Sequence, residues 1–317
     1  MITVRYHYTV EGDIILKKTL YAIVLMFLIF FVIGCQQQST QNTNTVYTSI
    51  YPIQYIVEEI GGDAIEVESV YPPGVDAHSY EPSSREMTKI AEGNSFIYLG
   101  AGMESFAETA ANALKNQPVE LVEIATLDDT LFSKSEDHDG HDHGDRDPHV
   151  WFDPLKMIQM GEIIKNTLSK EFPNSKPIFD DNFNVFKDNM NQLDNEFTKT
   201  LKPKKNKEIL VAHAAYGYWE ERYGIKQISI SGLSTNDEPS QRDLTRIVKA
   251  AKKHKLPYVI FEQTGTDKVS NIIREHIDAK PLYMHNLESL TDEDIQNNED
   301  YLTLMKHNLH VLDKATK

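Results

Sequence analysis

The sequence lacks a second cysteine: Cys35 is the only one in 317 residues, so the chain cannot form an internal disulfide. It also lacks an excess of positive charge, because 32 Lys and Arg stand against 48 Asp and Glu, for a formal net charge of −16. Nucleic-acid binding relies on clustered cations that release counterions, so this balance argues against nucleic acid as a partner. The hydrophobic fraction of 40% and the charged fraction of 25% are typical of a globular protein, and the length suggests about two domains.

Two further absences narrow the function. The sequence contains no GxxxxGK[ST] loop, which indicates that the chain does not hydrolyse ATP, and it contains no HExxH or CxxC spacing. Its one long apolar run, residues 20–33, has 14 residues, whereas a spanning helix needs about 20. Without several spans, the chain is not expected to conduct ions itself.

The N-terminal segment is predicted to be a targeting signal rather than part of the fold. Lys17 and Lys18 precede the apolar run, which is typical of a signal-peptide core. The run ends in residues 32–35 (VIGC), which resemble a bacterial lipobox, in which the cysteine is acylated after cleavage. The alternatives are an ordinary signal peptide or a buried core cysteine.

We therefore predict a signal peptide over residues 1–34. Residues 1–15 fit no part of a signal, which suggests that the start codon is assigned too far upstream. Residues 35–45 would form a lipidated cysteine and a flexible polar tether.

Beyond the tether, strand-like runs alternate with helical patterns, which is typical of βαβ units with parallel sheets. A capping-box pattern begins a helix at Ser83, and a second helix is expected to begin at Ser240. The expected strands cover residues 46–50, 65–71, 95–99, 208–212, 226–230 and 258–261. The sequence therefore predicts an α/β fold with two lobes, residues 46–176 and residues 203–317.

A single long helix is predicted between the lobes, over residues 177–202. Its apolar residues recur every three or four positions without an interrupting Gly or Pro. These residues are Phe179, Phe183, Phe186, Met190, Leu193, Phe197 and Leu201. Such a helix is either a stiff connector along both lobes or a long surface helix.

Three histidines occupy loops that follow predicted strands or turns: His78, His149 and His213. In open α/β sheets, ligands bind beyond the carboxyl ends of the strands, and at least His78 and His213 lie at such ends, in different lobes. Spacing alone leaves two interpretations open, namely metal ligands or polar side chains that are satisfied within the fold.

The chain resembles the zinc/manganese family of solute-binding lipoproteins of bacterial ABC transporters from about Val46 to Leu312. The motifs that carry the resemblance are Tyr51-Pro52 and residues 61–63 (GGD), 74–82 (GVDAHSYEP), 147–151 (DPHVW), 213–218 (HAAYGY) and 232–240 (GLSTNDEPS). The resemblance implies two α/β lobes joined by one long rigid helix, with a metal ion in the cleft between the lobes.

The resemblance also implies metal ligands at His78, His149 and His213 and a carboxylate from the loop before the last helix, which here is Glu288. Glu262, which follows a predicted strand, is the rival fourth ligand, and it could instead hydrogen-bond a ligand histidine or serve an accessory metal site. His285 is a third candidate because it lies close to Glu288.

The remaining histidines of the two lobes are not expected to bind the metal. His254 is predicted at the end of a helix, and His276, His307 and His310 are predicted to face solvent on helices. Three imidazoles and one carboxylate favour Zn²⁺ over Mn²⁺, which prefers more oxygen ligands. Because an unperturbed histidine titrates near about 6.5, we expect metal binding to weaken below about pH 7.

Residues 136–149 (EDHDGHDHGDRDPH) are rich in His and Asp and are predicted to form a loop within the N-terminal lobe. His138, His141 and His143 could form a weak accessory zinc site, or the segment could be a solvated acidic loop.

The leading hypothesis is a receptor, not an enzyme, that is lipid-anchored on the outer side of the cell membrane. It would bind Zn²⁺ and deliver it to an ABC permease driven by a separate ATPase. The alternatives are a manganese receptor of the same family, a secreted zinc hydrolase and a surface adhesin.

Overall fold

The computed structural model describes residues 44–133, 146–234, 239–263 and 268–316. All of the described residues belong to one compact unit. The predicted signal peptide, Cys35 and the three histidines of the His-rich loop lie outside the described residues. Within the described ranges, no helix is long and apolar enough to cross a membrane.

The N-terminal lobe is built on a sheet of four parallel strands in the order β2-β1-β3-β4. The strands are β1 (Thr45–Thr48), β2 (Glu66–Ser69), β3 (Ser95–Tyr98) and β4 (Glu120–Glu123). The central strands β1 and β3 are buried throughout, whereas the edge strands carry glutamates. The sequence predicted the first three strands but not β4.

The C-terminal lobe repeats this topology, with four parallel strands in the order β6-β5-β7-β8. The strands are β5 (Glu208–Val211), β6 (Lys226–Ser229), β7 (Tyr258–Glu262) and β8 (Lys280–Met284). The prediction of two α/β lobes with parallel sheets is confirmed, although β8 was not foreseen.

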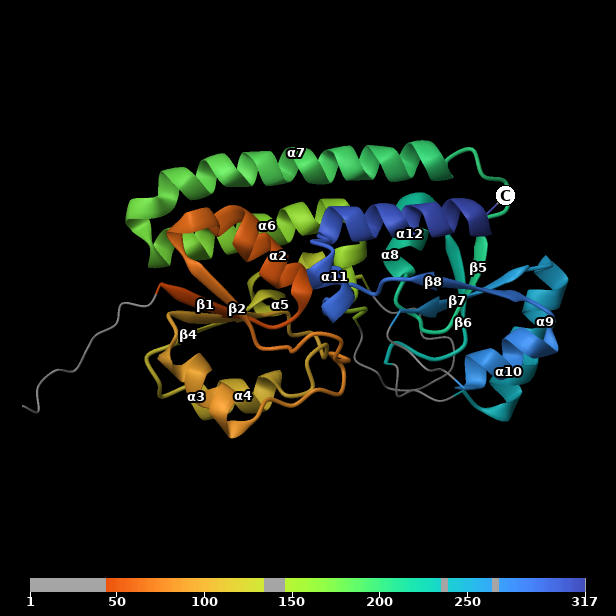
Figure 1. Ribbon diagram of the computed structural model, residues 1–317, viewed down its shortest axis with the longest axis horizontal. Helices are drawn as coiled ribbons and strands as arrows, with labels where there is room; N and C mark the ends of the chain where they lie inside the picture. The colour runs from red at the N-terminus through yellow and green to blue at the C-terminus, as the bar shows by residue number, and fades with distance from the viewer. Residues whose placement is uncertain (1–43, 134–145, 235–238, 264–267, 317) are drawn as a thin grey trace, which may run out of the picture. The chain divides into compact units, whose positions relative to one another are not determined.

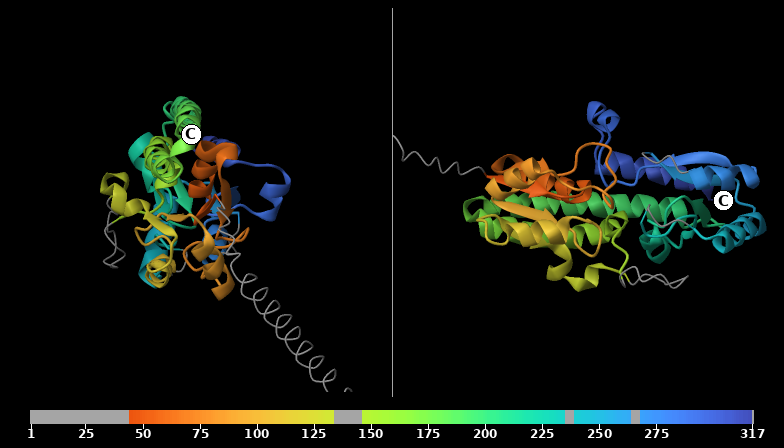
Figure 2. Two further views of the ribbon diagram at one scale, coloured as in Figure 1. Left: turned by 90° about the vertical axis from the view of Figure 1, so that its left-hand side faces the viewer. Right: turned by 90° about the horizontal axis from the view of Figure 1, so that it is seen from below.

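Helices cover the faces of both sheets (Figures 1 and 2). The α-helices are α2 (Tyr51–Gly61), α3 (Ser84–Glu92), α4 (Ala107–Leu114), α5 (Ile124–Leu127), α6 (Pro154–Glu171), α7 (Lys176–Leu201), α8 (Gly217–Tyr223), α9 (Gln241–His254), α10 (Lys268–His276), α11 (Asp292–Gln296) and α12 (Tyr301–Ala315). Short 3₁₀ helices are η1 (Gly62–Ala64), η2 (Asp129–Leu131), η3 (Val150–Phe152) and η4 (Pro173–Ser175). The predicted capping box forms at Ser83, at the start of α3, and the helix expected from Ser240, α9, also begins with a capping box.

Helix α7 runs along both lobes, as Figure 1 shows, and all seven residues of its predicted apolar stripe are buried. At a rise of 1.5 Å per residue, its 26 residues reach about 39 Å. Phe186 lies 6.2 Å from the ring of Tyr55 on α2, and Phe197 lies 5.9 Å from Trp219 on α8. Each buried aromatic side chain contributes roughly 1.5–3 kcal/mol, so α7 is fixed to both lobes by apolar packing.

A partly buried ion pair adds to this packing in the C-terminal lobe. Asp194 of α7 accepts two hydrogen bonds from Arg222 of α8, at 2.8 Å from Nε and 2.6 Å from Nη2. The hydroxyl of Tyr223 donates a third at 3.0 Å. Because a two-pronged guanidinium contact is geometrically specific, it fixes the orientation of α8 on α7.

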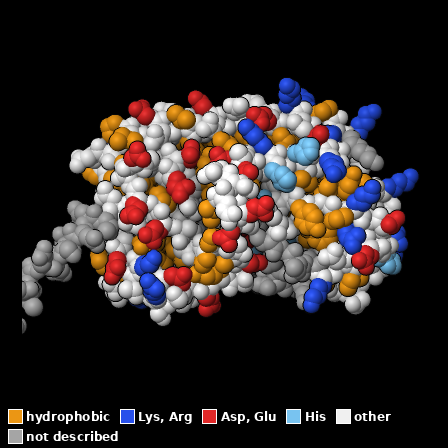
Figure 3. Space-filling view, in the orientation of Figure 1, with side chains coloured by type: hydrophobic (Ala, Val, Ile, Leu, Met, Phe, Trp, Pro, Cys, Tyr) orange, Lys and Arg blue, Asp and Glu red, His pale blue; other side chains and the backbone are white. Residues whose placement is uncertain are grey.

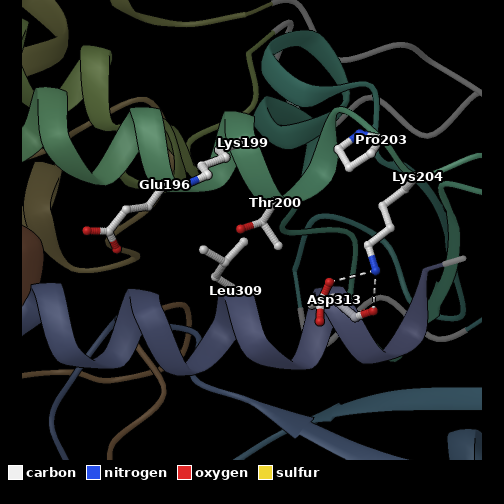
Figure 4. Close-up of a pocket in the computed structure, with 7 residues that line it drawn as sticks. All are labelled: Glu196, Lys199, Thr200, Pro203, Lys204, Leu309 and Asp313. Atoms are coloured by element: carbon white, nitrogen blue, oxygen red, sulfur yellow. Dashed lines mark hydrogen bonds and ion pairs between the residues drawn. The ribbon is translucent and has the colours of Figure 1, made fainter.

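A surface groove of about 700 Å³ lies between the end of α7 and α12. Figure 4 shows that Lys204 reaches across it to Asp313, with Nζ 2.6 Å from Oδ1 and 2.8 Å from the carbonyl oxygen. None of the histidines or glutamates predicted as ligands lines this groove. Its charged contacts connect two helices and do not indicate a ligand site.

Glu171, the last residue of α6, is a partly buried acid away from the three histidines. Burial raises the pKa of its carboxyl group to about 7, and Glu120 adds to this effect, while Ser95 and Lys170 oppose it. The ordinary value is 4.5, so the folded protein holds this proton more tightly than the unfolded chain does. Ionisation of Glu171 therefore destabilises the fold increasingly between about pH 4.5 and 7.

Substitution Glu171→Gln should stabilise the protein at pH 8, by on the order of 1–3 kcal/mol, and have little effect at pH 5. Denaturant unfolding at the two pH values measures this difference. Glu162→Gln, on the exposed face of the same helix, is the matched control. An equal gain at both pH values would show that the ionisation of Glu171 is not responsible.

Candidate metal centre

Three histidines that are far apart in the sequence meet between the two sheets. The nearest nitrogens of His78, His149 and His213 all lie within 4.8 Å of one another, and no other such group of three His, Cys, Asp or Glu occurs in the described part of the chain. Their ring centroids are 4.9–5.6 Å apart. His78 lies in the loop after β2, His149 directly before η3, and His213 two residues after β5.

The orientation of His149 is set by Asp147. Its Oδ1 accepts hydrogen bonds from the backbone amide of His149 at 2.9 Å and from Nδ1 at 2.8 Å. The ring proton therefore lies on Nδ1, which leaves a lone pair on Nε2, and this atom is buried without a hydrogen-bond partner. Complete burial lowers the pKa of His149, despite the opposing effect of Asp147, so the ring is neutral.

Aromatic donors hold the segment around His149 against the C-terminal lobe. Tyr218 of α8 donates to the carbonyl oxygen of Asp147 at 2.8 Å. Trp151 donates from Nε1 to the carbonyl oxygen of Asn286 at 2.9 Å, and Tyr301 of α12 donates to the carbonyl oxygen of Trp151 at 2.6 Å. The position of His149 thus depends on contacts with three segments of the C-terminal lobe.

His213 makes a hydrogen bond through each ring nitrogen. Nδ1 lies 2.6 Å from Oε1 of Glu262, and Nε2 lies 2.7 Å from the carbonyl oxygen of Leu233. Burial opposes a charge on this ring, but the paired carboxylate of Glu262 outweighs burial, and the pKa of His213 is raised to about 9. Near pH 7, His213 is therefore an imidazolium that donates from both nitrogens.

Glu288 extends toward the three histidines from the loop after β8. Its Oε2 accepts a hydrogen bond from the backbone amide of Ala77 at 3.2 Å. Its Oε1 is buried without a hydrogen-bond partner and lies 3.7 Å from Nε2 of His78, which is also buried and unpartnered. Burial and the nearby Glu262 raise the pKa of Glu288 to about 8.

Glu262, the last residue of β7, differs from Glu288 because both of its oxygens have partners. Oε1 pairs with His213, and Oε2 accepts from the side-chain amide of Asn286 at 3.2 Å. Burial would raise its pKa, but His213 outweighs burial and keeps the pKa below its ordinary value. Glu262 thus fixes the orientation of the His213 ring, in the same way as Asp147 fixes that of His149.

The other histidines lie where the sequence placed them. His254 ends α9 and pairs with Glu208, while His276, His307 and His310 are exposed on α10 and α12. His285 is buried near the cluster but is not part of it, because its ring nitrogens contact Leu287 and Asp294.

Sequence reasoning missed the role of Asp147, although the Asp-Pro-His pattern was available as a signal. It also missed Leu233 and the amide of Ala77, whose contacts depend on backbone geometry that has no side-chain signature.

Three imidazoles with a carboxyl group beside them form a donor set of borderline softness, which suits a divalent transition-metal ion. Two α/β lobes with parallel sheets, one long helix along both lobes and a site of this kind define the class of two-lobed solute-binding proteins.

The chain belongs to the family described as zinc-uptake complex component A, periplasmic, whose model matches residues 46–315. It is 31% identical over 308 residues to the zinc-binding lipoprotein AdcA of Streptococcus pneumoniae, covering 95% of this chain and 61% of AdcA. It is 28% identical to the high-affinity zinc uptake system protein ZnuA of Bacillus subtilis, covering 92% of this chain and 95% of that protein.

The chain thus spans about three fifths of the length of the AdcA proteins it matches. The fold is also similar to the crystal structure of the Zn(II)-bound ZnuA-like domain of S. pneumoniae AdcA. That comparison has a TM-score of 0.72 and 31% identity and covers 86% of this chain and 98% of the domain. The similarity to known proteins therefore extends over both lobes.

Proposed function

We propose that the protein is an extracytoplasmic receptor that binds Zn²⁺ between its lobes through His78, His149, His213 and Glu288. The observation that carries this proposal is a set of three buried atoms without hydrogen-bond partners: Nε2 of His78, Nε2 of His149 and Oε1 of Glu288. Because buried polar atoms are nearly always paired, three orphans on adjacent side chains favour a missing common partner, and a metal ion satisfies all of them.

The donor set favours Zn²⁺ over Mn²⁺. Imidazole nitrogen is a good ligand for zinc, whereas manganese is better served by carboxylate, carbonyl and water oxygens. The free oxygen of Glu288 supports this residue as the fourth ligand. Glu262, with both oxygens engaged, instead orients His213, as carboxylates commonly orient metal-bound histidines.

Zinc binding requires two local changes at the site. Nε2 of His213 must lose its proton and release the carbonyl oxygen of Leu233, because this nitrogen is the one that Glu262 leaves for a metal. Glu288 must lose its proton as well. The site therefore exchanges protons for zinc while the remaining hydrogen bonds keep the side chains in place.

Four protein ligands favour binding and release over catalysis. A catalytic zinc keeps one coordination position open for water, and Glu288 would occupy that position here. The proposal therefore makes the protein a carrier that delivers zinc to a membrane permease powered by a separate ATPase, and not a zinc hydrolase.

On the face shown in Figure 3, acidic side chains predominate over the N-terminal lobe, and Lys and Arg gather over the C-terminal lobe. The exposed cations of α9 include Arg242, Lys249 and Lys253. On this face a permease would therefore meet an acidic N-terminal lobe beside a group of cations on the C-terminal lobe, which favours one docking orientation over others.

Substitutions at the site test the proposal. His78→Ala, His149→Ala, His213→Ala and Glu288→Gln should each weaken zinc binding at least about 10–100-fold, since even indirect contacts to a metal cost that much. Competition with a chelator of known affinity measures the dissociation constants. His307→Ala, an exposed histidine on α12, is the control.

Glu262→Gln should weaken binding less than Glu288→Gln, because it removes an orienting contact and not a ligand. If Glu262→Gln had the larger effect, the assignment of the fourth ligand would be wrong. If His307→Ala were as harmful as His213→Ala, the proposed site as a whole would be wrong.

The pH dependence of zinc binding follows from the shifted pKa values. Burial lowers the pKa of His78 to about 2 and that of His149 in the same direction, so neither holds a proton to be displaced. His213, near 9, and Glu288, near 8, do hold protons at pH 7. Zinc affinity should therefore rise by up to about 100-fold per pH unit below pH 8 and level off above pH 9.

Calorimetry in buffers of different ionisation enthalpy should report about two protons released per zinc at pH 7. In Glu262→Gln the pH dependence should be shallower, because His213 loses its closest carboxylate. A flat affinity profile between pH 6 and 9 would contradict these protonation states.

We further propose that Cys35 carries a lipid anchor and that residues 36–45 tether the receptor to the outer face of the membrane. The VIGC motif and the preceding apolar run support this. Mass spectrometry of the N-terminal peptide from membrane fractions should show an acylated Cys35. An unmodified N-terminus beyond residue 35 would contradict the anchor.

A further inference from the structure

We infer that His285 is a positioning residue that holds the Glu288 loop in its metal-binding shape without itself contacting the metal. The inference rests on the proposed zinc site. It concerns the loop of residues 285–288, which follows β8 and ends at Glu288, and the contacts of this loop with α11 and α12.

Both ring nitrogens of His285 are occupied. The backbone amide of Leu287 donates to Nδ1 at 2.9 Å, so Nδ1 carries a lone pair and not a proton. Nε2 must then carry the proton, and it donates to Oδ2 of Asp294 at 3.0 Å. No lone pair is left for a metal ion, which removes His285 from the candidate ligands.

The backbone and the ring partner of His285 are each fixed from a neighbouring helix. The side chain of Asn308 on α12 accepts from the amide of His285 and donates to its carbonyl oxygen, both at 2.8 Å. Asp294 on α11 is held in turn by the amide of Thr291 at 2.8 Å and by its hydroxyl at 2.5 Å. The backbone of His285 and the carboxyl group of Asp294 are therefore both fixed, and the imidazole lies between them.

The contact with Leu287 matters because of the backbone at that residue. Leu287 has φ of 65°, in the left-handed region that side chains with a Cβ disfavour, and it is completely buried. The acceptor on His285 satisfies its amide and so stabilises this turn. The next residue is Glu288, whose amide is held by Oδ1 of Asn286 at 3.2 Å.

If Nδ1 were lost, the buried amide of Leu287 would have no acceptor, and the turn would relax toward negative φ. That change would move Glu288 relative to Ala77 and to the three histidines. The role assigned to His285 is therefore transmitted through the backbone of a single residue, Leu287.

Two substitutions separate the two nitrogens. In His285→Asn the amide oxygen lies near the position of Nδ1 and can accept from Leu287. In His285→Gln the amide nitrogen lies near the position of Nε2 and can donate to Asp294, but the acceptor is lost. A residue that only stabilises the fold would not distinguish between the two nitrogens in this way.

Zinc affinity should fall less than about 3-fold in His285→Asn and at least about 10-fold in His285→Gln, relative to the wild type and the His307→Ala control. In a Glu288→Gln background, His285→Gln should cause no further loss, because both changes act on the same ligand. Co²⁺ used as a spectroscopic substitute should keep its imidazole ligands in both His285 variants.

Hydrogen exchange of the Leu287 amide tests the contact without any metal. The amide should stay protected in His285→Asn and exchange faster in His285→Gln, with thermal unfolding confirming that both variants fold.

Equal exchange rates, or a loss of affinity in His285→Gln that adds fully to that of Glu288→Gln, would overturn the inference. Loss of an imidazole from the Co²⁺ spectrum would instead make His285 a ligand. If the wild type failed to bind zinc, both the proposed function and the role of His285 at the metal site would be wrong. The hydrogen-exchange result would still show whether His285 holds the Leu287 amide.

Discussion

Burying three carboxyl groups and three imidazoles close together is the constraint on which the rest of the site depends. An ionised group removed from water is strongly destabilising unless it is paired or changes its protonation state. Both responses occur here. Glu262 pairs with His213, Asp147 pairs with His149, and Glu288 holds a proton near neutral pH.

These pairings leave two nitrogens and one oxygen buried without hydrogen-bond partners. We interpret this arrangement as a site preformed for a cation, in line with the proposed function. In the proposed zinc-bound state, the charge of the metal replaces the protons of His213 and Glu288. It also offsets the repulsion that ionised Glu288 meets from Glu262, so the carboxyl group that holds a proton in the free site can bind the metal.

The lobes are held in register by contacts that lie outside the metal site. Helix α7 packs its apolar stripe against α2 and α6 at one end and against α8 and α12 at the other. Hydrogen bonds also cross between the lobes, such as Nε1 of Trp219 donating to the carbonyl oxygen of Phe152 at 2.8 Å. This packing favours metal entry and release through local loop changes, such as the release of Leu233, over a wide hinge motion.

Much of the fold could be predicted because its patterns are local. The stripe on α7 and the helix starts at Ser83 and Ser240 each depend on residues within a few turns of one another. Strands β4 and β8 were missed because ELVE is short and charged and KPLYM contains a proline, so neither shows a strand pattern. Proline is tolerated in β8 because this strand lies at the edge of its sheet.

The three histidines were identified from the sequence, but their protonation states were not. An unperturbed pKa would place the pH response of zinc binding below about pH 7, whereas burial removes His78 and His149 from the titration and Glu262 moves His213 above neutrality. The choice between Glu288 and Glu262 likewise depends on which oxygens have partners. The positive φ of Leu287 has no sequence signature, since the residue at that position is neither glycine nor asparagine.

Zinc K-edge X-ray absorption of the purified protein loaded with one equivalent of Zn²⁺ tests the central claim most directly, because it counts the ligands by type. The account predicts three imidazole nitrogens and carboxylate oxygen from one glutamate, with one zinc bound per chain. Multiple-scattering features that fit fewer than three imidazoles, or a spectrum that Glu288→Gln leaves unchanged, would contradict it.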